Sequence, residues 1–208
     1  MARTCLVVGC AANVWKEVEE AQKLCTFDAV YCVKQAGIYW PGKFNVWASL
    51  HPEYMLGENP RRVDYVAERI AVGHPGGYEI VVPLPGEVGE WKNTCKTARR
   101  VSYRWKGMNA SASSGIYGAK VALDDGHDRV VLAGIPMTKD AGHFLPRTKN
   151  VAGDIRGPVW LQRDSFTPGF ELAKPHLLGK VRSMSGLTKE ILGYPTIEWL
   201  AGVGKDNN

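Results

Sequence analysis

The chain has 208 residues, which suits a single α/β domain and allows a substantial buried core. Hydrophobic residues make up 45% and charged residues 23%, a balance that excludes a disordered or collagen-like chain. The net charge of +5 is unevenly spread, because positions 92 to 106 carry six Lys and Arg residues and no acidic residue.

The sequence lacks both a membrane-spanning stretch and paired cysteines, which narrows the class of protein further. The longest apolar stretches, such as Val130 to Met137, are far shorter than the roughly 20 residues that cross a bilayer, and the N-terminus enters a strand-like run without a cleavable leader. Five cysteines with no CxxC spacing indicate reduced thiols rather than a disulfide framework or a zinc site. We therefore expect a cytoplasmic protein without a membrane span.

Apolar, β-rich runs bounded by glycine or proline recur along the chain. In several of them nearly every position is apolar, which is typical of strands buried on both faces. The predicted strands are Thr4–Gly9, Ala29–Val33, Asn45–Leu50, Glu79–Pro83, Arg129–Ala133 and Lys180–Met184.

Helical patterns lie between these strands. Val14–Leu24 follows Asn13, a good N-cap residue, and Pro60–Val72 begins with a proline where a helix tolerates one. The apolar face expected for the second helix consists of Val63, Val66, Ala67, Ile70 and Ala71. A third helix, Ser114–Asp125, has small residues at helical spacing that allow its backbone to lie close to a sheet, and Gly126 ends it.

This alternation predicts a Rossmann-like α/β fold, with a mostly parallel sheet and helices on both faces. We expect one nucleotide-binding domain over residues 1–203 and a flexible tail over 204–208. Two irregular regions, Leu84–Gly107 and Gly142–Gly169, are interpreted as long loops near the site. Ligands of such folds lie at the carboxyl ends of the strands.

Three strand ends carry candidate nucleotide contacts, each with a purely structural alternative. Small or polar residues follow the first strand, where they form either a phosphate cradle or a tight turn. Hydroxyls precede the third helix and follow the last strand, where they either contact a ligand or cap helices. The candidates are Gly9, Cys10, Ala11, Asn13, Ser113, Ser114, Gly115, Gly134, Pro136, Ser183 and Ser185.

The segment from Ser113-Ser114-Gly115 to Gly134-Ile135 resembles the central segment of bacterial sialyltransferases that use CMP-sialic acid. It is also similar to the related motility accessory factor and hydroxymethylpterin pyrophosphokinase-like proteins, which have phage-encoded relatives; for a phage-encoded chain the location would be the host cytoplasm. The resemblance implies a nucleotide bound along the strand ends. Lys34 stands where these enzymes typically have asparagine, and a lysine can reach a phosphate as a point charge. Met137-Thr138-Lys139 stands in place of the tyrosines that hold the leaving phosphate.

Histidines are the candidate general bases, because imidazole titrates near neutrality. The family's base lies in the C-terminal part, which favours His143 or His176, and we rank His143 first. His51, at the end of the third strand, is the second candidate. We expect His74 and His127 on surface turns.

The sequence contains no carboxylate or histidine motif that predicts a metal site, so we expect no metal and no cofactor beyond the nucleotide-sugar co-substrate. The basic stretch, with Arg99, Arg100, Arg104 and Lys106, is interpreted either as a solvated face or as a nucleic-acid surface.

The leading hypothesis is thus a metal-independent glycosyltransferase with a nucleotide-sugar donor and a polyanionic acceptor such as DNA. The alternatives are a non-catalytic module that sequesters or senses a nucleotide and a pterin-type pyrophosphate-transferring enzyme. The first alternative is favoured by the loss of the family tyrosines and asparagine, and the second finds little carboxylate support for Mg²⁺.

Overall fold

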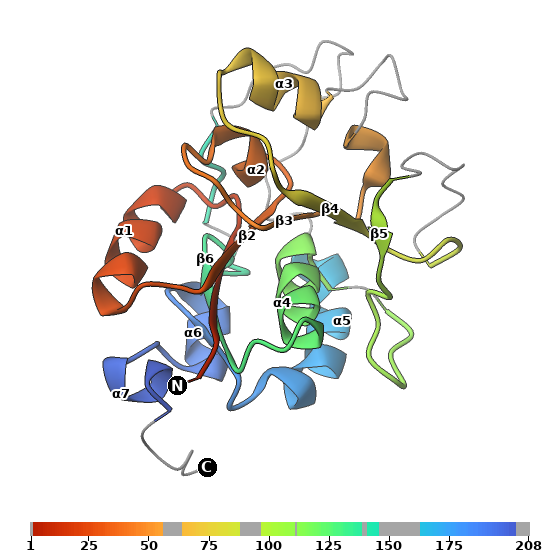
Figure 1. The fold of residues 1–208 in the computed structure, drawn as a ribbon. Coiled ribbons are helices and arrows are strands. Elements are labelled where there is room, and N and C mark those ends of the chain that lie inside the picture. Colours follow the sequence, from red (N-terminus) through yellow and green to blue (C-terminus); the bar gives the residue numbers. More distant parts are fainter. Residues whose placement is uncertain are drawn as a thin grey trace.

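The seven strands of the described part of the chain form one parallel sheet (Figure 1). The structure is a computed structural model that describes residues 2–55, 64–87, 97–110, 112–138, 141–145 and 163–202. The strands are β1 Thr4–Val8, β2 Ala29–Val33, β3 Val46–Ala48, β4 Glu79–Val82, β5 Arg99–Arg100, β6 Arg129–Ala133 and β7 Val181–Ser183. Their order is β5-β4-β3-β2-β1-β6-β7, and every neighbouring pair is parallel.

The direction of the connections changes at β1. The chain moves outward from β1 through β2, β3, β4 and β5, and then continues on the other side of β1 with β6 and β7. In open α/β sheets, the crevice outside the carboxyl ends of the strands at such a point is the usual ligand site. The fold therefore points to the ends of β1 and β6.

Helices cover both faces of the sheet, as the sequence predicts (Figure 1). The helices are α1 Val14–Leu24, α2 Ala36–Tyr39, α3 Tyr65–Ala71, α4 Ser114–Asp124, α5 Arg163–Leu177, α6 Gly186–Leu192 and α7 Ile197–Leu200, with a 3₁₀ turn at Pro52–Tyr54. Helices α4 and α5 pack on one apolar cluster, which includes Ile116 and Phe170. The cluster on the other face includes Val18 of α1, Ile38 of α2 and Trp199 of α7. The Rossmann-like α/β prediction is confirmed.

Most predicted elements are present with small changes at their ends. All six predicted strands form, and α1 has the predicted bounds. The backbone of α4 does lie close to the sheet, because a Cβ on Gly118 would come within 2.9 Å of methyl groups of Val7 and Val33. Gly126 follows the helix with φ +82, a conformation that glycine adopts without strain.

Two predicted loops contain regular structure. Strand β5 lies in the stretch 84–107 and consists of two half-buried arginines, so no apolar pattern marked it. Helix α5 begins inside the stretch 142–169 and contains Pro168 and Pro175, which usually end a helix. The buried positions Phe170, Ala173 and Leu177 nevertheless follow a helical spacing. These parts of the loop prediction were wrong.

The predicted apolar face of α3 was also wrong. The described helix begins at Tyr65, and Pro60 and Val63 lie outside the described residues. Ile70 is 70% exposed, whereas the buried residues are Tyr65 and Arg69. The buried stripe therefore contains a charged residue, which an apolar pattern does not detect.

Arg69 of α3 forms hydrogen bonds to α2 and to the residues that follow α2. Its guanidinium donates to the carbonyl oxygens of Gly37 at 2.6 Å, Trp40 at 2.8 Å, Gly42 at 2.9 Å and Pro75 at 3.0 Å. Carbonyls at a helix C-terminus lack partners within the helix, so a buried cation satisfies them. Arg69 thus replaces the backbone partners that a four-residue helix cannot supply.

His127 is buried rather than placed on a surface turn. It is 5% exposed, and its ring meets the Tyr31 ring edge-to-face at 5.7 Å. Burial lowers the pKa of His127, and the nearby Arg3 lowers it further. The neighbouring Gly126 is typical of an exposed turn, which explains the wrong prediction, but the imidazole of His127 is buried beneath that turn.

Candidate functional site

A pocket opens at the carboxyl edge of the sheet, beside the ends of β1 and β6. The space between its walls, together with the part that is open to solvent, amounts to about 690 Å³. Nine of the predicted nucleotide contacts line it: Gly9, Cys10, Ala11, Lys34, Ser113, Ser114, Gly115, Gly134 and Pro136. Asn13, Ser183, Ser185, His51 and His143 do not line it.

Further lining residues lie outside the candidate set. The other described residues of the wall are Val33, Ile135, Met137, Thr138, Ala141, Gly142 and Phe166. Phe166 comes from α5, so the misassigned loop hid it. Ala141 and Gly142 belong to a segment whose backbone is pinned to the end of β1: Ala12 donates to Ala141 at 3.2 Å and Phe144 to Cys10 at 3.1 Å. Nothing in the sequence predicted that Ala141 and Gly142 line the pocket, because small residues at such positions are common in ordinary loops.

The glycines at the strand ends allow the chain to pack closely around the pocket. A Cβ on Gly9 would lie 2.3 Å from the Gly134 carbonyl oxygen, and one on Gly115 would lie 2.6 Å from a methyl group of Ile135. A side chain at Gly9 would therefore displace the Gly134 backbone, and one at Gly115 would displace the Ile135 side chain. Gly115 therefore serves contact with Ile135, in addition to any contact with a ligand.

The turn after β1 does not provide the predicted phosphate cradle at three of its amides. Gly9 donates its N–H to Ala133 at 2.7 Å, Ala11 to Gly134 at 3.1 Å, and Ala12 to Ala141 at 3.2 Å. An amide that is bonded within the protein is not available to a ligand. For these amides the alternative interpretation, a tight structural turn, is correct.

The N-terminus of α4 does offer polar groups to the pocket. Ser113 caps the helix by accepting from the Ile116 amide at 3.3 Å. Ser114 is 4% exposed, and its hydroxyl has no hydrogen-bond partner in the described structure. A buried hydroxyl without a partner is costly, and it lies beside the positive end of an 11-residue helix. This end of the pocket is therefore suited to an oxygen-rich, negatively charged ligand.

Two pocket residues have strained backbones. Lys34 has φ +49 and Met137 has φ +51, and they are the two non-glycine residues with positive φ in the described part of the chain. Left-handed conformations cost roughly 1 kcal/mol or more for residues with a Cβ. Strain of this kind concentrates at functional sites, and here it occurs at the ends of β2 and β6. Lys34 is also a cation in the pocket wall.

The remaining hydroxyl candidates support the pocket from behind. Ser183 is 1% exposed and lies 2.8 Å from the Thr188 hydroxyl, which donates to the Ile135 carbonyl at 2.7 Å. A Cβ on Gly186 would lie 2.4 Å from Pro136, so the end of β7 packs directly on the pocket wall. The Ser185 hydroxyl is buried without a partner in the described structure. No direct ligand contact of Ser183 follows from this geometry.

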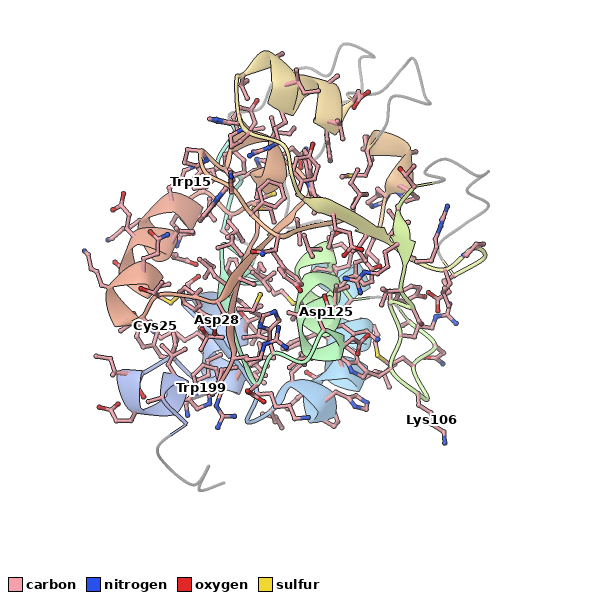
Figure 2. The ribbon with its side chains drawn as sticks, in the orientation of Figure 1. Trp15, Cys25, Asp28, Lys106, Asp125 and Trp199 are labelled. Carbon is pink, nitrogen blue, oxygen red and sulfur yellow. The ribbon has the colours of Figure 1, made fainter. Side chains whose placement is uncertain are left out.

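His143 is held in a specific tautomer. Its Nδ1 accepts from the Leu145 amide at 3.0 Å, and its ring stacks on Phe144 at 4.9 Å. Phe144 in turn contacts Trp15 and Tyr39 edge-on, at 5.3 and 5.7 Å. Figure 2 shows Trp15 at the N-terminal end of α1. A neutral imidazole that accepts at Nδ1 carries its proton on Nε2, so this ring presents a donor.

His51 has the opposite arrangement. Its Nδ1 lies 3.2 Å from Oε1 of Glu53, whose side chain is 5% exposed, while the imidazole is 38% exposed. Since a carboxylate only accepts hydrogen bonds, Nδ1 donates, and the lone pair of the neutral ring is on Nε2. His51 follows β3, two strands from β1, or about 10 Å away along the same edge.

His176 does not line the pocket. Its ring stacks on Trp105 at 5.2 Å, three turns along α5 from Phe166, which lines the pocket.

None of the four basic candidates around β5 lines the pocket, and Arg99 among them faces the amino edge of the sheet. Arg99 makes two bonds of 2.8 and 2.9 Å to Asp125, which follows α4 at the end remote from Ser113, and a third of 2.9 Å to Glu79. Figure 2 shows Lys106 projecting from this far end of the molecule. The hypothesis that Arg99, Arg100, Arg104 and Lys106 rim the pocket for a DNA acceptor gains no support from this arrangement.

Within the described residues, no group of three or more His, Cys, Asp or Glu side chains is placed to hold a metal ion. No described helix is both long and apolar enough to span a membrane. Cys5, Cys10, Cys25 and Cys32 form no disulfide, and Cys95 lies outside the described residues.

Known structures share this fold. The chain is similar to the sialyltransferase CST-II in complex with a trisaccharide acceptor and CMP, with 12% identity, a TM-score of 0.61, and coverage of 93% of this chain and 87% of that one. It is also similar to CstII from Campylobacter jejuni in complex with the substrate analogue CMP-3FNeuAc, with 15% identity, a TM-score of 0.60, and coverage of 95% and 88%. Neither protein-family models nor curated protein sequences give a match. The chain thus has a sialyltransferase-like fold.

Proposed function

We propose that the chain is a glycosyltransferase that binds a nucleotide-sugar donor in this pocket. The observation that carries the proposal is the Ser114 hydroxyl, buried without a partner in the described structure at the N-terminus of α4. An oxygen-rich ligand would supply the missing partner, and the helix dipole favours negative charge there. The similarity to sialyltransferases seen with CMP and CMP-3FNeuAc favours a cytidine monophosphate sugar as the donor class.

Charge in the pocket wall is consistent with a single phosphate. Lys34 supplies one cation, and the described lining includes no carboxylate that would hold Mg²⁺ between the oxygens of a diphosphate. The donor phosphate would lie between Lys34 and the start of α4, with the sugar toward the open side. We keep the expectation that transfer is metal-independent.

The proposed reaction transfers the glycosyl group from phosphate to an acceptor hydroxyl. The acceptor oxygen attacks the anomeric carbon, the bond to the phosphate oxygen breaks, and the nucleotide leaves with that electron pair. An imidazole takes the acceptor proton and later returns it to water. His51 suits this part, because Glu53 orients its ring with the lone pair on Nε2, whereas His143 suits donation of a hydrogen bond.

Calorimetry and donor hydrolysis test the proposal together. We expect CMP to bind more tightly than UDP or GDP, and a CMP-sugar to be hydrolysed slowly in the absence of an acceptor. Binding without hydrolysis would instead identify a nucleotide-binding module. No binding of any of the three nucleotides would contradict the proposal.

Substitutions at His51 and Glu53, with His74 as a control, test whether His51 is the general base. His51→Ala should reduce turnover about 100-fold without weakening CMP binding, and Glu53→Gln should reduce it less. His74→Ala, at a turn away from the pocket, should leave turnover unchanged. If His51→Ala retains full turnover while His143→Ala loses it, the two roles are reversed.

A further inference from the structure

Glu17 is a carboxylate on the otherwise apolar stripe of α1. It is 4% exposed and lies between Val14, Val18 and Ala21, which are also buried. Its Oε2 accepts from the Gly134 amide at 2.7 Å, and its Oε1 accepts from the Asn13 side-chain amide at 2.6 Å. Burial of a carboxylate is costly unless hydrogen bonds compensate it, and each oxygen here has one.

These bonds hold Gly134 in an unusual conformation. Gly134 has φ +70, and a Cβ there would lie 2.5 Å from a methyl group of Val14. Its N–H is directed to Glu17 while its carbonyl accepts from the Ala11 amide at 3.1 Å. The end of β6 is therefore fixed to the start of α1 on one side and to the turn after β1 on the other.

The fixed turn determines where the next residue lies. Ile135 follows Gly134 and packs against Gly115, so closely that a Cβ on Gly115 would lie 2.6 Å from it. Gly115 adjoins Ser114, which lines the pocket and whose buried hydroxyl has no partner in the described structure. A continuous chain of contacts thus runs from Glu17 through Gly134 and Ile135 to the N-terminus of α4.

We infer that Glu17 is a positioning residue, which sets the shape of the pocket by holding Gly134 and thereby Ile135 against the start of α4. Asn13, expected to contact the nucleotide, acts instead on the second oxygen of Glu17. The inferred effect on nucleotide binding rests on the proposed function, whereas the effect on pocket shape does not.

The first test measures the pocket without a ligand. In Glu17→Ala, hydrogen exchange of the Gly134 amide should accelerate by about 100-fold, and alkylation of Cys10, which lines the pocket, should change in rate. Glu17→Gln should keep both near the wild-type values, since its carbonyl still accepts from Gly134 and the Asn13 amide can turn to match it. Glu20→Ala is the matched control, because Glu20 lies on the same helix and is 41% exposed.

The second test measures nucleotide binding. Glu17→Ala should weaken CMP binding about tenfold while remaining folded at the assay temperature, and Glu17→Gln should restore most of it. Asn13→Ala should give a smaller loss, and the Asn13 and Glu17 losses should not be additive.

The outcomes separate the two claims. A wild-type chain that binds no nucleotide contradicts the proposed function, and the exchange of Gly134 still decides the role of Glu17. Unchanged Gly134 exchange in Glu17→Ala overturns the inference. If the wild type binds CMP, an equal affinity of Glu17→Ala for CMP also overturns it.

Discussion

Adjacent serines at the start of α4 have different roles. Ser113 caps the helix through its bond to the Ile116 amide, whereas the Ser114 hydroxyl has no partner in the described structure. Ser113→Ala should lower the free energy of unfolding by about 1 kcal/mol. Ser114→Ala should raise it by about 1 kcal/mol, because the cost of a buried hydroxyl without a partner is removed, yet weaken CMP binding about tenfold. Urea unfolding and calorimetry measure the two effects.

The reverse pattern of CMP binding in these two variants would contradict the prediction. If Ser113→Ala weakens binding and Ser114→Ala does not, the ligand contacts the cap residue, and the assignment of the Ser114 hydroxyl is wrong.

Lys34 combines strain with charge, and two substitutions separate them. Lys34→Gly removes the charge and relieves the left-handed backbone at φ +49, so stability should rise by about 0.5 to 1 kcal/mol. Lys34→Ala removes the charge and keeps the strain, so stability should not rise. CMP affinity should fall equally in both variants if the ammonium contacts phosphate. Equal melting temperatures for the two variants would show that the strain is unimportant.

Residue identity predicted the pocket lining better than it predicted function within the site. Glycine and serine at strand ends mark a crevice, because close packing and helix starts restrict which residues fit. The roles of His51 and His143 could not be predicted, because they depend on which ring nitrogen meets Glu53 or the Leu145 amide. Glu17 gave one signal that was overlooked: a carboxylate on the apolar stripe of a helix.

At the scale of elements, α2 and the segment after it depend on Arg69 of α3. Its four carbonyl partners would be left without a donor in Arg69→Met, and we expect the free energy of unfolding to fall by about 3 kcal/mol. Arg182→Met, at a partly exposed arginine that donates to Tyr194, should cost about 1 kcal/mol or less. Similar urea midpoints for the two variants would show that Arg69 is not needed.

Sequence patterns predicted individual strands and helices correctly where a single property, such as continuous hydrophobicity, determined the element. Buried strands such as β1 and β6 were predicted because nearly every residue is apolar. Helix α5 was missed because Pro168 looks like a helix end, and β5 because two arginines carry no apolar signal. The buried face of α3 was missed because tertiary contacts, rather than hydrophobicity, bury Arg69.

For the whole molecule, the buried groups at the amino edge of the sheet predict loss of stability in acid. Burial lowers the pKa of His127 below its usual value of 6.5. The unfolded chain therefore binds this proton first, and the free energy of unfolding falls as the pH drops below about 6.5. For Asp125, burial alone would raise the pKa, but hydrogen bonds from Arg99 and Tyr31 outweigh it, and the pKa is lowered from 3.8. Its contribution is lost at lower pH, below about 4.

Thermal melts can separate these two windows. The wild-type melting temperature should fall from about pH 7.5 to about pH 5.5, and His127→Phe, which keeps the ring contact with Tyr31, should flatten this part of the curve. Asp125→Asn should change the curve below about pH 4 and leave the upper window unchanged. An unaltered upper window in His127→Phe would assign the effect to another group.

The proposed nucleotide site lies at the carboxyl edge of the sheet, beside the ends of β1 and β6. The most direct measurement is a titration of the ¹⁵N-labelled chain with CMP, followed through the backbone amide signals. We predict the largest shifts at Ser114, Gly115 and Gly134, with little change at the opposite edge around Asp125. Shifts that centre on that opposite edge, or no shifts at saturating CMP, UDP and GDP, would contradict the account.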